Sequence, residues 1–271
     1  MDSDYKYDVM KMYFGDDYYA SPKICIHQPS IGEIIEYGET AFWSNVTMLC
    51  GNTTSFRLQL WNNGIDWNKI SDFELFSSII SGMSIEKTNI FFGELDFTKM
   101  RPIENKDEKL VLVYMPDPEI QIDEEMYNRI IGYLRLMVNY YPEIEKAKNK
   151  ATKEALIWED EMNLKNAERL KKDEKFQPSI LFPLISAALN HPGFKYKKSE
   201  LKEVGIFEFM DSIRRLQVYE STTSLMKGMY SGFVDTSKLK LDKELNWARN
   251  IYEDDDKPVP KEDKKNSDQK S

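Results

Sequence analysis

The chain has 271 residues, of which 41% are hydrophobic and 13% aromatic, so it can bury a core in one large domain or two modest ones. Twelve glycines and eleven prolines are few for a β-sandwich or barrel, and 31% charged residues favour long solvated helices. The formal net charge is −9, and residues 1–142 carry it, with 22 acidic and 12 basic side chains. Such a surface repels phosphate backbones, so nucleic acid is not expected to bind this half.

Membrane, secreted and metal-dependent classes find no support in the sequence. No apolar run reaches the roughly 18 to 20 residues that span a bilayer, and MDSDYKYDVM lacks the basic and apolar regions of a secretion signal. We therefore expect no membrane contact and a cytoplasmic location. Cys25 and Cys50 lack CxxC spacing and a His at ligand spacing, which predicts two buried free thiols and no metal or cofactor.

The first segment alternates Asp, Lys and Tyr without a sustained period. It predicts a loosely ordered lead-in over residues 1–22, with Tyr5, Tyr7 and Tyr13 as docking side chains. The apolar run that follows predicts one short strand at residues 24–27.

Two capping boxes mark helix starts in the next stretch. SIGE at residues 30–33 precedes apolar residues at helical spacing and predicts a helix over residues 30–50. Alternating apolar residues at 56–60 predict a strand. SDFE at residues 71–74 then opens a short helix.

A small antiparallel sheet is expected next. Residues 88–92 and 109–115 are rich in Ile, Phe, Val and Leu and are the best strand candidates. Two prolines end the second strand, and Asp123 then caps a helix with one apolar face. Together these elements predict an acidic α+β front domain over residues 23–141.

A charged helix is expected to connect this domain to the rest of the chain. Residues 143–175 hold nine acidic and nine basic side chains, no Gly or Pro, and few apolar anchors. This pattern predicts a solvated connecting helix over residues 142–177.

The rear of the chain is more apolar and predicts an all-α domain over residues 178–252. Its helices are expected at residues 179–189, 199–204, 206–228 and from residue 240 onward. Residues 253–271 contain no aromatic and one aliphatic residue, which predicts a disordered tail. The expected fold class is mainly α with a small antiparallel β element.

No motif indicates a catalytic site. The sequence has no GxSxG, HExxH, Walker or GxGxxG pattern, and its two imidazoles, His27 and His191, sit in turn-like contexts that favour structural roles. Acidic residues 159–161 point in different directions on a helix, and residues 254–256 lie in the expected tail. We expect a protein that is not an enzyme, with a carboxylate-dependent hydrolase as an alternative.

Residues 194–215 faintly resemble a helix-turn-helix, because Lys195, Lys197 and Lys198 precede two helices separated by Gly205. The second helix begins IFEFMD, whereas a reading helix presents Arg, Lys, Asn or Gln to base edges. A nucleic-acid-associated regulator is therefore an alternative, with nucleic acid unlikely as the main partner.

Large aromatic side chains are the best candidates for binding another protein, because they anchor interfaces when the core does not consume them. Core packing is the competing interpretation. The partner-binding candidates come from the aromatic front half and the helical rear: Trp43, Trp61, Trp67, Tyr219, Tyr230 and Trp247.

Three stretches, about one eighth of the chain, resemble proteins of the tail-gene modules of Firmicute phages and prophages. They are LQVYESTTSLMKGMYSGFVD at residues 216–235, LNW at residues 245–247, and PSIGEIIEYGE at residues 29–39. Such proteins are similar to tail assembly chaperones or baseplate hub assembly factors. The resemblance implies binding to a tail structural protein (tape measure, tail tube or hub) in the bacterial host cytoplasm or in the virion. It carries over no functional residue.

Overall fold

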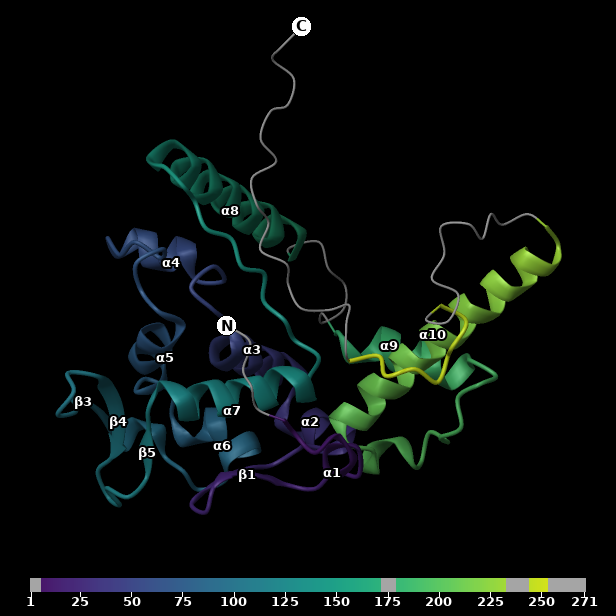
Figure 1. Ribbon diagram of the computed structural model, residues 1–271, viewed down its shortest axis with the longest axis horizontal. Helices are drawn as coiled ribbons and strands as arrows, with labels where there is room; N and C mark the ends of the chain where they lie inside the picture. The colour runs from purple at the N-terminus through teal and green to yellow at the C-terminus, as the bar shows by residue number, and fades with distance from the viewer. Residues whose placement is uncertain (1–5, 172–178, 233–243, 253–271) are drawn as a thin grey trace, which may run out of the picture.

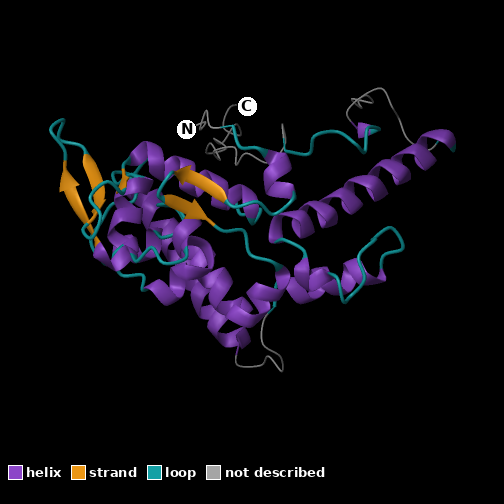
Figure 2. Cartoon of the chain, turned by 90° about the horizontal axis from the view of Figure 1, so that it is seen from below, coloured by secondary structure: helices purple, strands orange, loops and turns teal. Residues whose placement is uncertain are grey.

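The computed structural model describes residues 6–171, 179–232 and 244–252, which are mainly helical with two small antiparallel sheets (Figure 1, Figure 2). This confirms the fold class expected from the sequence. Both sheets lie before residue 123. Within the described ranges, no helix is long and apolar enough to cross a membrane.

The front of the chain is folded from residue 6, where the sequence predicted a loosely ordered lead-in. Helix α1 (Val9–Tyr13) precedes strands β1 (Tyr18–Ser21) and β2 (Ile24–Ile26), which form an antiparallel hairpin. Tyr7 fixes this region because its ring lies against Gly132, and its hydroxyl donates to the carbonyl of Arg129 at 2.9 Å.

The helix predicted over residues 30–50 is divided into α2 (Ile31–Tyr37) and α3 (Glu39–Cys50). Ser30 caps α2 with the expected capping box. The division occurs at Gly38, whose φ of +100° no side-chain-bearing residue adopts easily. The second predicted capping box opens α5 (Asp72–Ile80).

Two predicted strands are helices in the structure. Residues 56–60 fall at α4 (Arg57–Asn62), and residues 88–92 fall in α6 (Ile85–Phe92). The buried side chains of α6 recur at i, i+3 and i+4, which is helical spacing: Thr88, Phe91 and Phe92. Their β-branched and aromatic composition suggested a strand, but the periodicity of burial is that of a helix.

A three-stranded sheet follows the short 3-10 helix η1 (Phe97–Lys99). Its order is β3-β4-β5, with β3 (Met100–Glu104), β4 (Leu110–Tyr114) and β5 (Gln121–Ile122) all antiparallel. Strand β4 confirms the strand predicted at residues 109–115. Its partner, however, is β3 and not residues 88–92.

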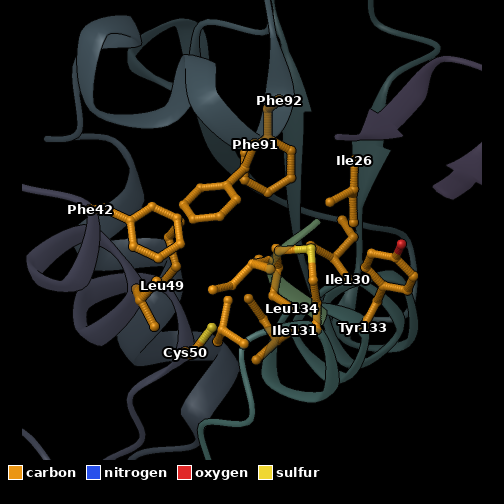
Figure 3. Close-up of a cluster of buried hydrophobic side chains, with 14 of the residues drawn as sticks. Ile26, Phe42, Leu49, Cys50, Phe91, Phe92, Ile130, Ile131, Tyr133 and Leu134 are labelled. Carbon is orange, nitrogen blue, oxygen red and sulfur yellow. The ribbon is translucent and has the colours of Figure 1, made fainter. Parts of the chain in front are cut away.

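Helix α7 (Glu124–Met137) passes through the centre of the main hydrophobic core, and Asp123 caps it as predicted. Figure 3 shows its buried side chains facing those of β2, α3 and α6. The labelled α7 residues are Ile130, Ile131, Tyr133 and Leu134. This helix therefore joins the hairpin at the front of the chain to the helices that follow it.

Helix α8 (Lys150–Lys171) is the charged helix expected from the sequence, and it begins after an irregular segment that follows α7. It covers a second, smaller hydrophobic cluster. The buried members of this cluster are Leu60, Trp67, Leu75, Ala147 and Ile157.

The rear segment contains α9 (Leu181–Asn190), the 3-10 helix η2 (Leu201–Glu203) and the long helix α10 (Ile206–Tyr230). Residues 194–215 thus hold a single 3-10 turn before α10, so the two-helix geometry of a helix-turn-helix is absent from this segment. Leu201 and Val204 are buried in the main hydrophobic cluster and hold that turn against the core.

The base of α10 is fastened to the front of the chain. The amide of Ile31 donates to the carbonyl of Val204, and that of Ile206 donates to Pro29, both at 2.9 Å. The main hydrophobic cluster also includes side chains from the rear segment, such as Leu181. This cluster therefore contains residues from both sides of residues 142–177. The division into two domains at those residues stays a prediction.

The last described segment, residues 244–252, packs along α10. Leu245 and Trp247 lie in turns and not in the helix predicted from residue 240 onward. Residue 240 itself and the predicted tail, residues 253–271, lie outside the described residues. The far end of α10 projects from the body of the molecule (Figure 2).

Candidate functional site

The main candidate binding site is a groove between residues 193–196, helix α10 and residues 244–252. It encloses about 470 Å³. Its lining is rich in aromatic side chains, and we call it the aromatic groove after them: Tyr13, Phe194, Tyr196, Tyr219 and Trp247. A concave surface of this kind offers apolar area to a partner without unfolding of the core.

Tyr219 and Trp247, both selected from the sequence, meet in this groove. Their ring centroids are 5.8 Å apart with the planes at 89°, an edge-to-face contact. Tyr219 is 44% exposed and Trp247 is 50% exposed. Each ring thus keeps about half of its surface available to a partner.

The backbone that carries Trp247 is held firmly against α10. One guanidinium nitrogen of Arg215, Nη1, donates to the carbonyls of Trp247 at 2.9 Å and Arg249 at 2.8 Å. The buried hydroxyl of Thr222 donates to the carbonyl of Glu244 at 3.0 Å. These bonds position the Trp247 ring even though half of it is exposed.

Tyr252 anchors the other end of the same segment. Its hydroxyl donates to Asp211 Oδ1 at 2.7 Å, and its ring stacks on the buried ring of Phe207 with centroids 5.5 Å apart. Burial, and then the hydrogen bond to Asp211, raise the pKa of Tyr252 above its ordinary value. The phenol therefore stays protonated near neutral pH and keeps donating to Asp211.

The opposite wall is built from the turn after α9. Phe194 and Tyr196 make an edge-to-face contact at 5.5 Å. The hydroxyl of Tyr196 donates to Glu208, which together with burial raises the pKa of Tyr196. Gly193 permits the turn to pass close to His191, since a Cβ there would lie 3.1 Å from the imidazole ring.

Both histidines contact carboxylates of neighbouring elements. His191 Nδ1 accepts from the amide of Gly193 at 3.0 Å, so Nε2 carries the proton directed at Glu220, 3.2 Å away. His27 lies 2.8 Å from Asp17 and 3.3 Å from Glu33, on the exposed surface. These contacts connect loop residues to neighbouring elements.

The carboxylates and thiols are the other groups that chemistry could use. No group of three or more His, Cys, Asp or Glu side chains in these ranges is placed to hold a metal ion. Asp160, from the acidic triplet of α8, is bound to Arg57. Cys50 is buried as predicted, whereas Cys25 is only partly buried.

The other four sequence-selected aromatics lie outside the aromatic groove. Trp67 is only 2% exposed and contacts Trp61 within the second hydrophobic cluster, with centroids 6.0 Å apart. Trp43 is partly buried beside the main core, and Tyr230 is 85% exposed at the end of α10. A fully buried ring has no surface for a partner, so Trp67 is excluded, and of the six candidates only Tyr219 and Trp247 line the groove and enter the proposal below.

Two groove aromatics were not selected from the sequence: Phe194 and Tyr196. Both residues flank Lys195 in the segment that follows a Pro-Gly turn. Alternate residues of an extended segment point the same way, so Phe194 and Tyr196 are expected to share a face. This spacing was the signal that could have identified them. Tyr13, which the sequence predicted as a docking side chain, lies at the end of α1 and also lines the groove.

No family model, curated protein or solved structure matches the chain. The two longer stretches that resemble phage tail-module proteins have definable places in the structure. Residues 29–39 include the contacts that fasten the base of α10, and residues 216–235 begin near the middle of that helix.

Proposed function

We propose that this chain is a binding protein, without a catalytic role, that holds a segment of another protein in the aromatic groove. The observation that carries the proposal is the pairing of Tyr219 and Trp247, two half-exposed rings on a backbone fixed by hydrogen bonds. Rings that are already positioned lose little conformational entropy on binding, and aromatic anchors dominate many interfaces.

We further propose that the partner is a phage tail structural protein: the tape measure, the tail tube or the hub. The chain would then act as a chaperone-like tail assembly factor, or as a minor tail or baseplate component. Support comes from the sequence resemblance, whose stretches at residues 216–235 and 245–247 supply both Tyr219 and Trp247.

The proposal is tested by titrating the purified chain against each tail protein encoded in the same gene module. We expect one of them to bind, and Trp247→Ala or Tyr219→Ala to weaken that binding about tenfold or more, the usual effect of removing an interface anchor. Tyr230→Ala is the matched control, because it removes an exposed aromatic ring of α10 outside the groove. Its affinity should equal that of the unmodified chain.

Two results would contradict different parts of this proposal. If none of the tail proteins binds, the phage assignment is wrong. If one binds but both groove variants bind it as well as the Tyr230→Ala control, the groove is not the binding surface. Circular dichroism of each variant establishes that a lost affinity does not come from a lost fold.

A further inference from the structure

Strand β3 lies at the outer side of its sheet, at one end of the molecule (Figure 1). It pairs with β4 along one edge, and the order β3-β4-β5 leaves its other edge without a strand of this sheet. Its side chains are exposed from Arg101 to Glu104, and Ile103 among them is 46% exposed. An exposed strand edge with an apolar side chain offers a template for pairing with another strand.

The hydrogen-bond pattern shows which residues of β3 face this outer edge. The amide of Asn105 donates to the carbonyl of Lys109 at 2.9 Å, and this bond continues the register of β3 with β4. In an antiparallel pair, residues that bond to the partner strand alternate with residues whose backbone groups point away from it. Arg101 and Ile103 therefore bond to β4. The outward backbone groups belong to the residues between and beside them: Met100, Pro102 and Glu104.

The outward groups of β3 are blocked at two adjacent residues. Pro102 has no N–H, so the edge lacks a donor there, and its ring fills the space into which that N–H would point. One guanidinium nitrogen of Arg101, Nη1, donates at 2.9 Å to the carbonyls of Thr98 and Met100. The outward carbonyl of Met100 is thus already an acceptor, and the amide of Met100 donates to the carbonyl of Phe97.

These blocks match the bonds that a second copy of β3 would need. Two identical strands pairing antiparallel about residue 102 would bond Pro102 to Pro102, and Met100 to Glu104, through backbone amides and carbonyls. Pro102 supplies no amide for the first pair. In the second pair, the carbonyl of Met100 is held by Arg101 and its amide by Phe97. Each bond of this pairing therefore lacks a free donor or meets competition for its acceptor.

We infer that Arg101 and Pro102 close the outer edge of β3 against pairing with a second copy of this chain. The two residues act differently. Pro102 removes a donor permanently, whereas Arg101 occupies an acceptor through a bond that an exposed side chain can exchange for water. Pro102 is therefore the stronger block and Arg101 the weaker one. Together they keep the edge unpaired although Ile103 is exposed beside it.

Sedimentation equilibrium of the full chain over a range of concentrations tests the inference with variants that open the edge. The double variant R101T/P102V restores the missing donor, releases the carbonyl of Met100 and adds two β-prone side chains. We expect it to dimerise with a dissociation constant at least about tenfold lower than that of the unmodified chain, because two-fold symmetry forms each recovered bond twice. Pro102→Val alone should lower the constant by a smaller factor, and Arg101→Thr alone should change it little.

Two controls separate edge pairing from association for other reasons. Pro118→Val makes the same change at an exposed proline in the turn between β4 and β5, and it should sediment as the unmodified chain does. The triple variant R101T/P102V/E104P keeps the new side chains but removes the outward amide of Glu104, so it should lose most of the gained affinity.

The inference is overturned if the double variant sediments as the unmodified chain does, or if the triple variant dimerises as tightly as the double variant. Circular dichroism of each variant establishes that any association comes from a folded chain. No variant changes a residue of the aromatic groove, so neither result bears on the proposed binding site.

Discussion

The contact between Arg57 and α8 allows a quantitative prediction of stability. Arg57 is only 8% exposed, and its guanidinium makes two bonds to Asp160, from Nε at 2.6 Å and from Nη2 at 2.7 Å. Its third nitrogen donates to Glu145. This one side chain therefore joins three segments that are distant in sequence: α4, the segment after α7, and α8.

Removal of this side chain leaves two carboxylates without their partner. Breaking a fully buried ion pair in this way costs about 3 to 5 kcal/mol. The side chains of Asp160 and Glu145 are 24% and 29% exposed, so water can solvate them in part. We therefore expect Arg57→Met to lower the free energy of unfolding by about 2 to 3 kcal/mol, below the fully buried case.

A double-mutant cycle with Arg57→Met and Asp160→Asn, followed by urea unfolding, isolates the pair. Its coupling energy should be about 2 kcal/mol. The control cycle uses Lys150 and Glu154 on the same helix, whose side chains are 84% and 57% exposed. That coupling should stay below about 0.5 kcal/mol. If both couplings are equally small, the reasoning that Arg57 secures α8 is refuted.

Two further predictions concern local features. Gly38→Ala should lower the free energy of unfolding by about 1 to 2 kcal/mol, because the φ of Gly38 is +100°. Gly82→Ala is the control, since the φ of Gly82 is not positive, and it should change the melting temperature little. Equal melting temperatures for the two variants would disprove this prediction. For thiol chemistry, burial raises the pKa of Cys50 to about 12, so a thiol reagent at mildly alkaline pH should modify only Cys25 until the chain unfolds. Two equivalents modified in the native chain would contradict this, and Cys25→Ser should abolish the native-state reaction.

Features that depend on a few neighbouring residues were predictable from the sequence. The capping boxes at residues 30–33 and 71–74, and the Asp123 cap, involve partners at most three residues apart. Strand β4 also matched, because its composition is strongly β-prone. In each case the stabilising contact is local, so the sequence pattern contains the relevant information.

The errors arose where tertiary contacts decided the structure. Phe56, Leu58 and Leu60 alternate like a strand, but α4 presents Arg57 to Asp160 of α8. That contact spans about a hundred residues, so no local pattern contains it. Residues 88–92 have strand-like composition, but they form part of α6. The helix is favoured because it places Phe91 and Phe92 in the main hydrophobic core.

The candidate site was likewise predictable only in its local features and not in its tertiary contacts. Tyr219 and Trp247 could be selected as aromatic residues, but nothing in the sequence indicated that their rings would meet. That contact depends on Arg215, which was selected only as the end of a possible nucleic-acid segment. In the structure it binds the backbone of Trp247 and Arg249. Hydrogen bonds from a side chain to a distant carbonyl leave no pattern in a single sequence.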